Sequence, residues 1–255
     1  MKLNYHQMTK EKGMARILLN RPKHNVLNLD MMQELTSILA EINADADLKC
    51  VVIGAQGPSW CAGVEVADHK PELAPDMIRV FNALLKQIHA LLVPSIAAVN
   101  GACLGGGMEV AIACDMVVAA KSAVFGQPEI KLGFLPPYAA VRLPHLVGPS
   151  RAIEICTTGR RYSAEAMQQM GIVSDVFDDE AFDEGLAKLT KEIQHASPLI
   201  LRLNKKAVNQ HLGMAIHAAM DSVSDMFLNQ LMKTEDTLEG IRSFEEKRRP
   251  EWKNR

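Results

Sequence analysis

The sequence has few cysteines, and their spacing suggests no pairs. Five cysteines are spread over 255 residues, and no two stand at the CxxC spacing of zinc-binding motifs. An odd number also argues against a disulfide framework of the kind found in small secreted proteins. We therefore expect no metal site and reduced thiols, as in a cytoplasmic protein. The cysteines are Cys50, Cys61, Cys103, Cys114 and Cys156.

The chain also lacks long apolar runs and an excess of charge of either sign. Residues 1–13 contain no signal-peptide-like apolar stretch, and the longest apolar run, residues 88–99, is interrupted by His89 and Pro94. The 28 basic and 30 acidic residues leave a net charge of −2. Nucleic-acid affinity comes largely from neutralised phosphates, so we expect neither a nucleic-acid partner nor a membrane.

Hydrophobic patterns divide the chain into two parts. Before about residue 150, strand-like segments alternate with helical periodicity, whereas helices dominate afterwards, beginning at about residue 151. No flexible linker separates the parts, so the pattern predicts one α/β core with a helical carboxyl-terminal extension. The expected strands are 14–19, 50–53, 95–99, 116–119 and 172–176, and the expected helices of the first half are 30–43, 76–92 and one from about Gly106.

Glycine-rich turns follow two of the expected strands. Residues 105–107 are three glycines between a strand and a helix, an arrangement that exposes backbone N–H groups to an anion or oxyanion. Neither phosphate-binding fingerprint is complete, since Val110 stands where GxGxxG needs glycine. Ala62 and Gly63 could supply a second amide to one carbonyl oxygen. The alternative in both places is an ordinary turn.

Two glutamates stand where chemistry is plausible. Glu109 lies on an otherwise apolar helix, where burial would raise the pKa of its carboxyl group toward neutrality. Glu129 follows a strand through Pro128 and could reach the same cleft. Such groups suit general acid–base catalysis. The alternative for each is a glutamate that caps a helix or pairs with an arginine such as Arg142.

Several motifs in register resemble the enoyl-CoA hydratase/isomerase (crotonase) superfamily, over residues 20–247. The resemblance implies a crotonase-like α/β fold, with a repeated ββα core over residues 1–197 and a helical trimerisation region over residues 198–255. It also implies trimers or dimers of trimers. The motifs are residues 97–109, 125–129, 158–159 with 163–164, 171–173 and 239–247.

The resemblance also implies the roles of individual residues. The backbone N–H groups of Ala62 and Gly106 would hold the thioester oxygen, with Gly63 and Gly105 beside them. Glu109 would deprotonate water and Glu129 would protonate the carbon next to the thioester, without a cofactor because coenzyme A belongs to the acyl-CoA substrate. Further substrate contacts are implied for Lys23, Glu65, Phe244 and Lys247, and structural roles for Asp115 and Gln127.

The chain departs from the family where the attacking water is held. Pro137 stands where many members have a glycine, and proline has no N–H to donate. Tyr138 is expected to line the site, with Phe134 and Leu135 shaping a broad apolar slot. This variation is similar to the branch that hydrates cyclic dienoyl-CoA thioesters such as cyclohexa-1,5-diene-1-carbonyl-CoA. The alternatives are an enoyl-CoA isomerase, which commonly lacks the first glutamate, and an RNA-binding or scaffold protein on the same fold.

Overall fold

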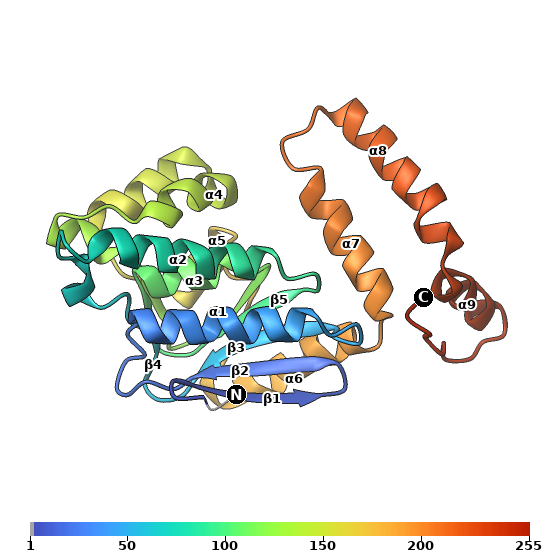
Figure 1. Cartoon of the computed structure of the whole chain (residues 1–255), viewed down its shortest axis with the longest axis horizontal. Coiled ribbons are helices and arrows are strands. Elements are labelled where there is room, and N and C mark those ends of the chain that lie inside the picture. Colours follow the sequence, from blue (N-terminus) through green and yellow to red (C-terminus); the bar gives the residue numbers. More distant parts are fainter. Residues whose placement is uncertain (1–2) are drawn as a thin grey trace.

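The structure is a computed structural model that describes residues 3–255. Its main sheet has six strands in the order β1-β2-β3-β5-β7-β10, of which only the β1–β2 pair is antiparallel. Figure 1 labels β1, β2, β3 and β5 of this sheet. Its central strands are buried on both faces, as expected for a parallel sheet covered by helices. The strands are β1 (His6–Glu11), β2 (Met14–Leu19), β3 (Cys50–Ala55), β5 (Ser95–Val99), β7 (Met116–Ala120) and β10 (Asp175–Phe177).

A second sheet of four very short strands lies beside the first. Its order is β4-β6-β8-β9, and β4, β6 and β8 are parallel. Each of these three strands directly follows a strand of the main sheet, so the core is built from repeated ββα units. The short strands are β4 (Ser59–Cys61), β6 (Ala102–Leu104), β8 (Val124–Gly126) and β9 (Tyr162–Ser163).

Helices cover both faces of the main sheet. On one face, α1, α2 and α3 pack over alternate side chains of the strands, and on the other face Leu186 of α6 packs against Val52, Ile96 and Val118. Asn28 starts α1 by accepting a hydrogen bond from the backbone of Met31. The core helices are α1 (Leu29–Asn43), α2 (Ala74–His89), α3 (Gly106–Ala113), α4 (Pro137–Thr158), α5 (Ala164–Gln169) and α6 (Phe182–Gln194).

The last three helices form an arm that stands away from the core (Figure 1). Helices α7 (Pro198–Gln210) and α8 (Ile216–Asn229) make an open hairpin, and α9 (Glu235–Glu245) lies near the carboxyl terminus. Pro198 is the only buried residue of α7 and Met226 the only one of α8. The arm therefore buries little apolar surface within its own chain.

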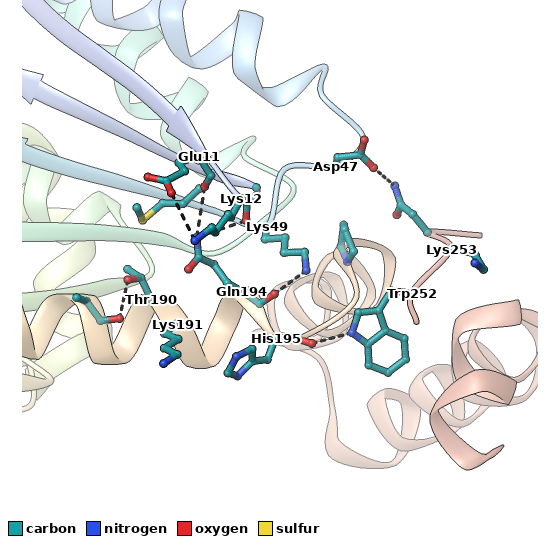
Figure 2. A pocket seen from close by; sticks show the side chains of 15 residues that line it. Glu11, Lys12, Asp47, Lys49, Thr190, Lys191, Gln194, His195, Trp252 and Lys253 are labelled. Carbon is teal, nitrogen blue, oxygen red and sulfur yellow. Dashed lines mark hydrogen bonds and ion pairs between the residues drawn. The ribbon is translucent and has the colours of Figure 1, made fainter. Parts of the chain in front are cut away.

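The arm contacts the core at an interface that contains a cavity of about 860 Å³ (Figure 2). The indole N–H of Trp252 donates to the carbonyl of His195 over 2.7 Å, and the ammonium of Lys49 donates to the carbonyl of Gln194 over 2.6 Å. Asp236 is fully buried and accepts a 2.6 Å hydrogen bond from the backbone N–H of Lys253. The cavity therefore lies at the interface between the core and the arm. The polar groups around it form hydrogen bonds that hold the arm against the core.

The structure reproduces the predicted strands β2, β3, β5 and β7 of the main sheet, whereas β10 begins at Asp175 and not at residue 172 as predicted. Helix α4 begins at Pro137 and not near residue 151, with a break at Gly148. The strands of the second sheet were not predicted, because two or three residues are too few to show a periodicity. Strand β1 was not predicted either, because it is mostly exposed and polar. Within residues 3–255, no helix combines the length and apolar character needed to cross a membrane.

Candidate active site

A cavity of about 300 Å³ opens where three chain segments leave the second sheet. The segments follow β4, β6 and β8, and each contributes residues to the wall. Helix α2 adds an apolar side through Met77, Ile78 and Phe81. The cavity therefore combines polar groups at strand ends with an apolar wall, as small-molecule sites commonly do.

Two backbone amides lie together at the inner end of this cavity. Gly105 has a φ of 54°, which lets the chain turn sharply from β6 into α3. Gly106 is the first residue of α3, so its N–H has no acceptor within the helix. The backbone nitrogen of Val64 lies 3.5 Å from the point where a Cβ on Gly106 would stand. The two N–H groups are placed to bind one oxygen.

Val64, and not Ala62, supplies the second amide. The N–H of Ala62 donates to the carbonyl of His24 over 2.9 Å, so it is already used. The N–H of Val64 donates to no group among residues 3–255. Gly63, with a φ of 121°, turns the chain between the two residues, so the assignment of Ala62 to the oxyanion site was wrong. Gly63 itself was the signal that could have revealed the turn.

Glu109 is buried at the base of the cavity and is 2 % exposed. Its Oε1 accepts hydrogen bonds from the backbone N–H groups of Tyr138 (2.7 Å) and Ala139 (2.8 Å), the first turn of α4. Burial raises the pKa of Glu109 to about 7; the N–H of Ala139 opposes the shift, and the nearby Glu129 carboxylate adds to it. Glu109 thus caps a helix and is also poised for proton transfer. Arg142 is not its partner, since that guanidinium donates to Ile112.

Glu129 reaches the same cavity from the short 3₁₀ helix η2 (Pro128–Leu132). Its Oε1 lies 2.7 Å from the point where a Cβ on Gly105 would stand, so a side chain at that position would displace the Glu129 carboxylate. With its amide nitrogen turned toward Glu129, the buried Gln127 donates to both carboxylate oxygens over 3.1 and 3.0 Å. Burial raises the pKa of Glu129. Both carboxyl groups therefore line the cavity that holds Gly106.

Pro137 lines the cavity as expected, but the Tyr138 side chain does not. The Tyr138 hydroxyl instead forms a hydrogen bond with His89, and its backbone N–H serves Glu109. The expectation that Tyr138 lines the site was therefore wrong, because the first turn of α4 directs its amides, not this ring, at Glu109. Phe134 and Leu135 do line the outer cavity.

The remaining predicted contacts lie outside this cavity. Lys23 is exposed, and Glu65 pairs through its Oε2 with Arg21 over 3.1 Å, so Glu65 has a structural partner instead of facing the substrate. Phe244 and Lys247 are exposed on the arm, and Figure 1 shows α9 far from the β4 and α4 end of the core. A single chain does not bring these residues to the site. Within residues 3–255, no three His, Cys, Asp or Glu side chains gather as a metal site.

Comparison with known proteins identifies the family of this chain. The enoyl-CoA hydratase/isomerase family matches residues 9–255. The chain belongs to this family. The cyclohexa-1,5-dienecarbonyl-CoA hydratase of Thauera aromatica is 32% identical over 97% of this chain and 96% of its own. The crotonyl-CoA hydratase of Syntrophomonas wolfei is 35% identical over 95% of each chain.

Solved structures show the same fold along the whole chain. The crystal structure of an enoyl-CoA hydratase from Bacillus anthracis superposes with a TM-score of 0.94, at 30% identity, over 99% of this chain and 100% of the other. The predicted crotonase-like α/β fold with a helical carboxyl-terminal region is thereby confirmed. The family and the names of the relatives support an enzyme of the hydratase type, which is a lyase.

The buried charge of Glu109 has a measurable effect on stability. A carboxyl group whose pKa is raised from 4.5 to about 7 on folding has little effect on stability at pH 4, where it is mostly protonated in both states. As pH rises the unfolded state ionises first, so stability falls and levels off above pH 7, at a loss of about 3 kcal/mol. We expect Glu109→Gln to increase the free energy of unfolding at pH 8 but not at pH 4, measured by urea denaturation. Glu41→Gln, on exposed α1 surface, is the matched control, and an absence of any gain at pH 8 would contradict the prediction.

Proposed function

We propose that this protein adds water across the double bond of a 2-enoyl-CoA thioester. The observation that carries the proposal is the meeting of two amides and two carboxyl groups in one cavity. Such a reaction needs a polarised carbonyl, a base for water and an acid for carbon. The two amides can polarise the carbonyl, one carboxyl group can act as the base and the other as the acid. The proposed reaction uses no cofactor.

The mechanism follows from the positions of these groups. The N–H groups of Val64 and Gly106 bind the thioester oxygen and stabilise the negative charge that it gains in the enolate. Glu109, as a carboxylate, removes a proton from water, whose oxygen bonds to the distal alkene carbon. Glu129, as a carboxylic acid, donates its proton to the carbon next to the thioester. Raised pKa values at both glutamates suit proton transfer near neutrality.

Each glutamate is expected to be essential for this reaction. We predict that Glu109→Gln and Glu129→Gln each lower kcat for crotonyl-CoA hydration by at least ~100-fold, the scale of general acid–base catalysis. Loss of absorbance of the conjugated thioester measures the rate, and Glu41→Gln should match the parent. In the parent, kcat/KM should fall below about pH 7 as Glu109 becomes protonated. Unchanged turnover in either variant would remove that residue from the mechanism.

The alternatives are less well supported. An isomerase moves a proton between carbons and has no need of a base for water, whereas Glu109 is buried and held by two N–H groups beside the cavity. An RNA-binding or scaffold role would leave two glutamates in an enclosed site unused, and the net charge is −2. An assay with an enoyl-CoA thioester distinguishes these functions: a hydratase adds water without moving the double bond, an isomerase moves the double bond, and a binding protein does neither.

A cyclic dienoyl-CoA is the substrate that the outer cavity favours. Phe134 and Leu135 line the same cavity as the apolar Phe81, and Pro137 brings an apolar ring and no N–H donor. The relative from Thauera aromatica, named for a cyclic dienoyl substrate, supports this choice. The amides of Tyr138 and Ala139 are both bound to Glu109, so the attacking water is held mainly by the two glutamates.

We predict that cyclohexa-1,5-diene-1-carbonyl-CoA has a higher kcat/KM than crotonyl-CoA, since a ring fills the slot that a four-carbon chain leaves partly open. Initial rates with both thioesters at one pH measure the ratio, and Leu135→Ala should reduce it. Glu41→Gln serves again as the unaffected control. If crotonyl-CoA is hydrated as efficiently as the cyclic thioester, the proposed hydratase activity is supported and the proposed preference for a cyclic substrate is wrong.

The arm favours self-association as a trimer or hexamer. Ile216, Met220 and Phe227 of α8 are more than half exposed, an apolar surface that a lone chain would leave in water. Phe244 and Lys247 meet coenzyme A only if α9 reaches a neighbour's site. The free thiols agree with a cytoplasmic location.

We predict a mass of three or six times 28.0 kDa by light scattering at micromolar concentration. Phe227→Asp should reduce the mass, because a buried charge without a partner opposes association, whereas Asp221→Asn on the same helix should not. A parent mass near 28.0 kDa would contradict self-association.

Phe244→Ala should raise the KM for the thioester, because Phe244 is expected to contact coenzyme A in a neighbour's site.

A further inference from the structure

Tyr138 and His89 form a hydrogen bond beside the base but outside the cavity. The Tyr138 hydroxyl lies 2.5 Å from His89 Nε2, and the two ring centroids are 5.7 Å apart. Tyr138 stands in the first turn of α4 and His89 is the last residue of α2. Neither side chain lines the cavity. The bond therefore joins the start of α4 to the end of α2.

Apart from the packing of the buried Pro136 and Ala139, the first turn of α4 has few other anchors. Pro136 precedes the helix without a side-chain cap, Pro137 has no N–H, and residues 130–135 before it are exposed. The same turn supplies both hydrogen bonds to Glu109 Oε1. Tyr138 thus contacts Glu109 through its backbone and α2 through its hydroxyl.

The surroundings of this hydrogen bond favour the neutral forms of both side chains. Burial, together with Arg142 of α4 and Lys205 of α7, lowers the pKa of His89 against the opposing effect of Asp115. Lys205 is itself paired with Asp115 over 2.6 Å. Burial raises the pKa of Tyr138 to about 12, so the tyrosine is neutral. One side chain of the pair then donates and the other accepts, according to which ring nitrogen of His89 carries the proton.

We infer that Tyr138 and His89 are positioning residues for Glu109. Their hydrogen bond fixes the first turn of α4 so that its two N–H groups hold the carboxylate at the cavity and stabilise its ionised form. The role of Glu109 as the base rests on the proposed function, but the effect of the pair on its ionisation does not.

Loss of the pair should change both the rate and the ionisation of Glu109. We expect Tyr138→Phe and His89→Ala each to lower kcat about tenfold with KM changed less than ~2-fold, within what misplacement of a reacting group can cost. Weaker N–H bonds favour the neutral carboxyl group, so the acid limb of kcat/KM should move to higher pH. His89→Gln, whose amide oxygen can accept from Tyr138, should restore most of kcat and the parent pH profile. The double variant should be no worse than either single one.

Controls and a readout that needs no turnover keep the outcomes distinct. His145→Gln, an exposed histidine on α4, and Tyr162→Phe, a hydroxyl bonded at the far part of α4, should match the parent. A ¹³C titration of the Glu109 carboxyl group, assigned with Glu109→Gln, should show a higher pKa in Tyr138→Phe. If the parent adds no water, the proposed function fails and this titration alone decides the inference. An unmoved Glu109 titration or acid limb, or additive losses in the double variant, would overturn it.

Discussion

The contact between the Glu109 carboxylate and the first turn of α4 connects most features of the site. Two N–H groups bind one carboxylate oxygen, which holds α3, α4 and the cavity floor in a fixed relation. Burial pushes the pKa of the group up while the N–H groups pull it down, and the result lies near neutrality. A fully solvated glutamate would be a weaker base, and a buried one without the helix N-terminus would stay protonated at pH 7.

Close backbone approach is the second requirement, and the second sheet provides it. The parallel strands β4, β6 and β8 end side by side, so the segments that follow them converge on one point. A Cβ on Gly107 would stand 2.4 Å from the carbonyl oxygen of Cys61, and one on Gly106 would stand 2.6 Å from a methyl group of Val64. These distances lie far inside van der Waals contact. The glycines are thus needed for packing as well as for their exposed N–H groups.

Local patterns predicted the parts of the site that depend on neighbours in sequence. Hydrophobic periodicity located the main strands and α1, and an isolated charge in an apolar helix drew attention to Glu109. The predictions for Ala62 and Tyr138 were wrong because residues distant in sequence determine where these groups point. Ala62 binds His24, which precedes it by 38 positions, and Tyr138 turns toward His89 on another helix. The oxyanion role proposed for Val64 depends on the turn at Gly63, and the Val64 side chain gives no sign of that role.

The two glutamates act as one electrostatic unit in the proposed reaction. The reaction begins with one proton on the pair, held by Glu129, and ends with one proton on the pair, held by Glu109. The Glu129 carboxylate raises the pKa of Glu109, so ionisation of both at once is disfavoured. Gln127 donates to Glu129 and the first turn of α4 donates to Glu109, so either carboxylate has donors when it carries the charge. The free energy of moving the proton from Glu129 to Glu109 therefore depends on the balance between the Gln127 amide and the N–H groups of α4. A change in either of these donors should alter both limbs of the pH profile.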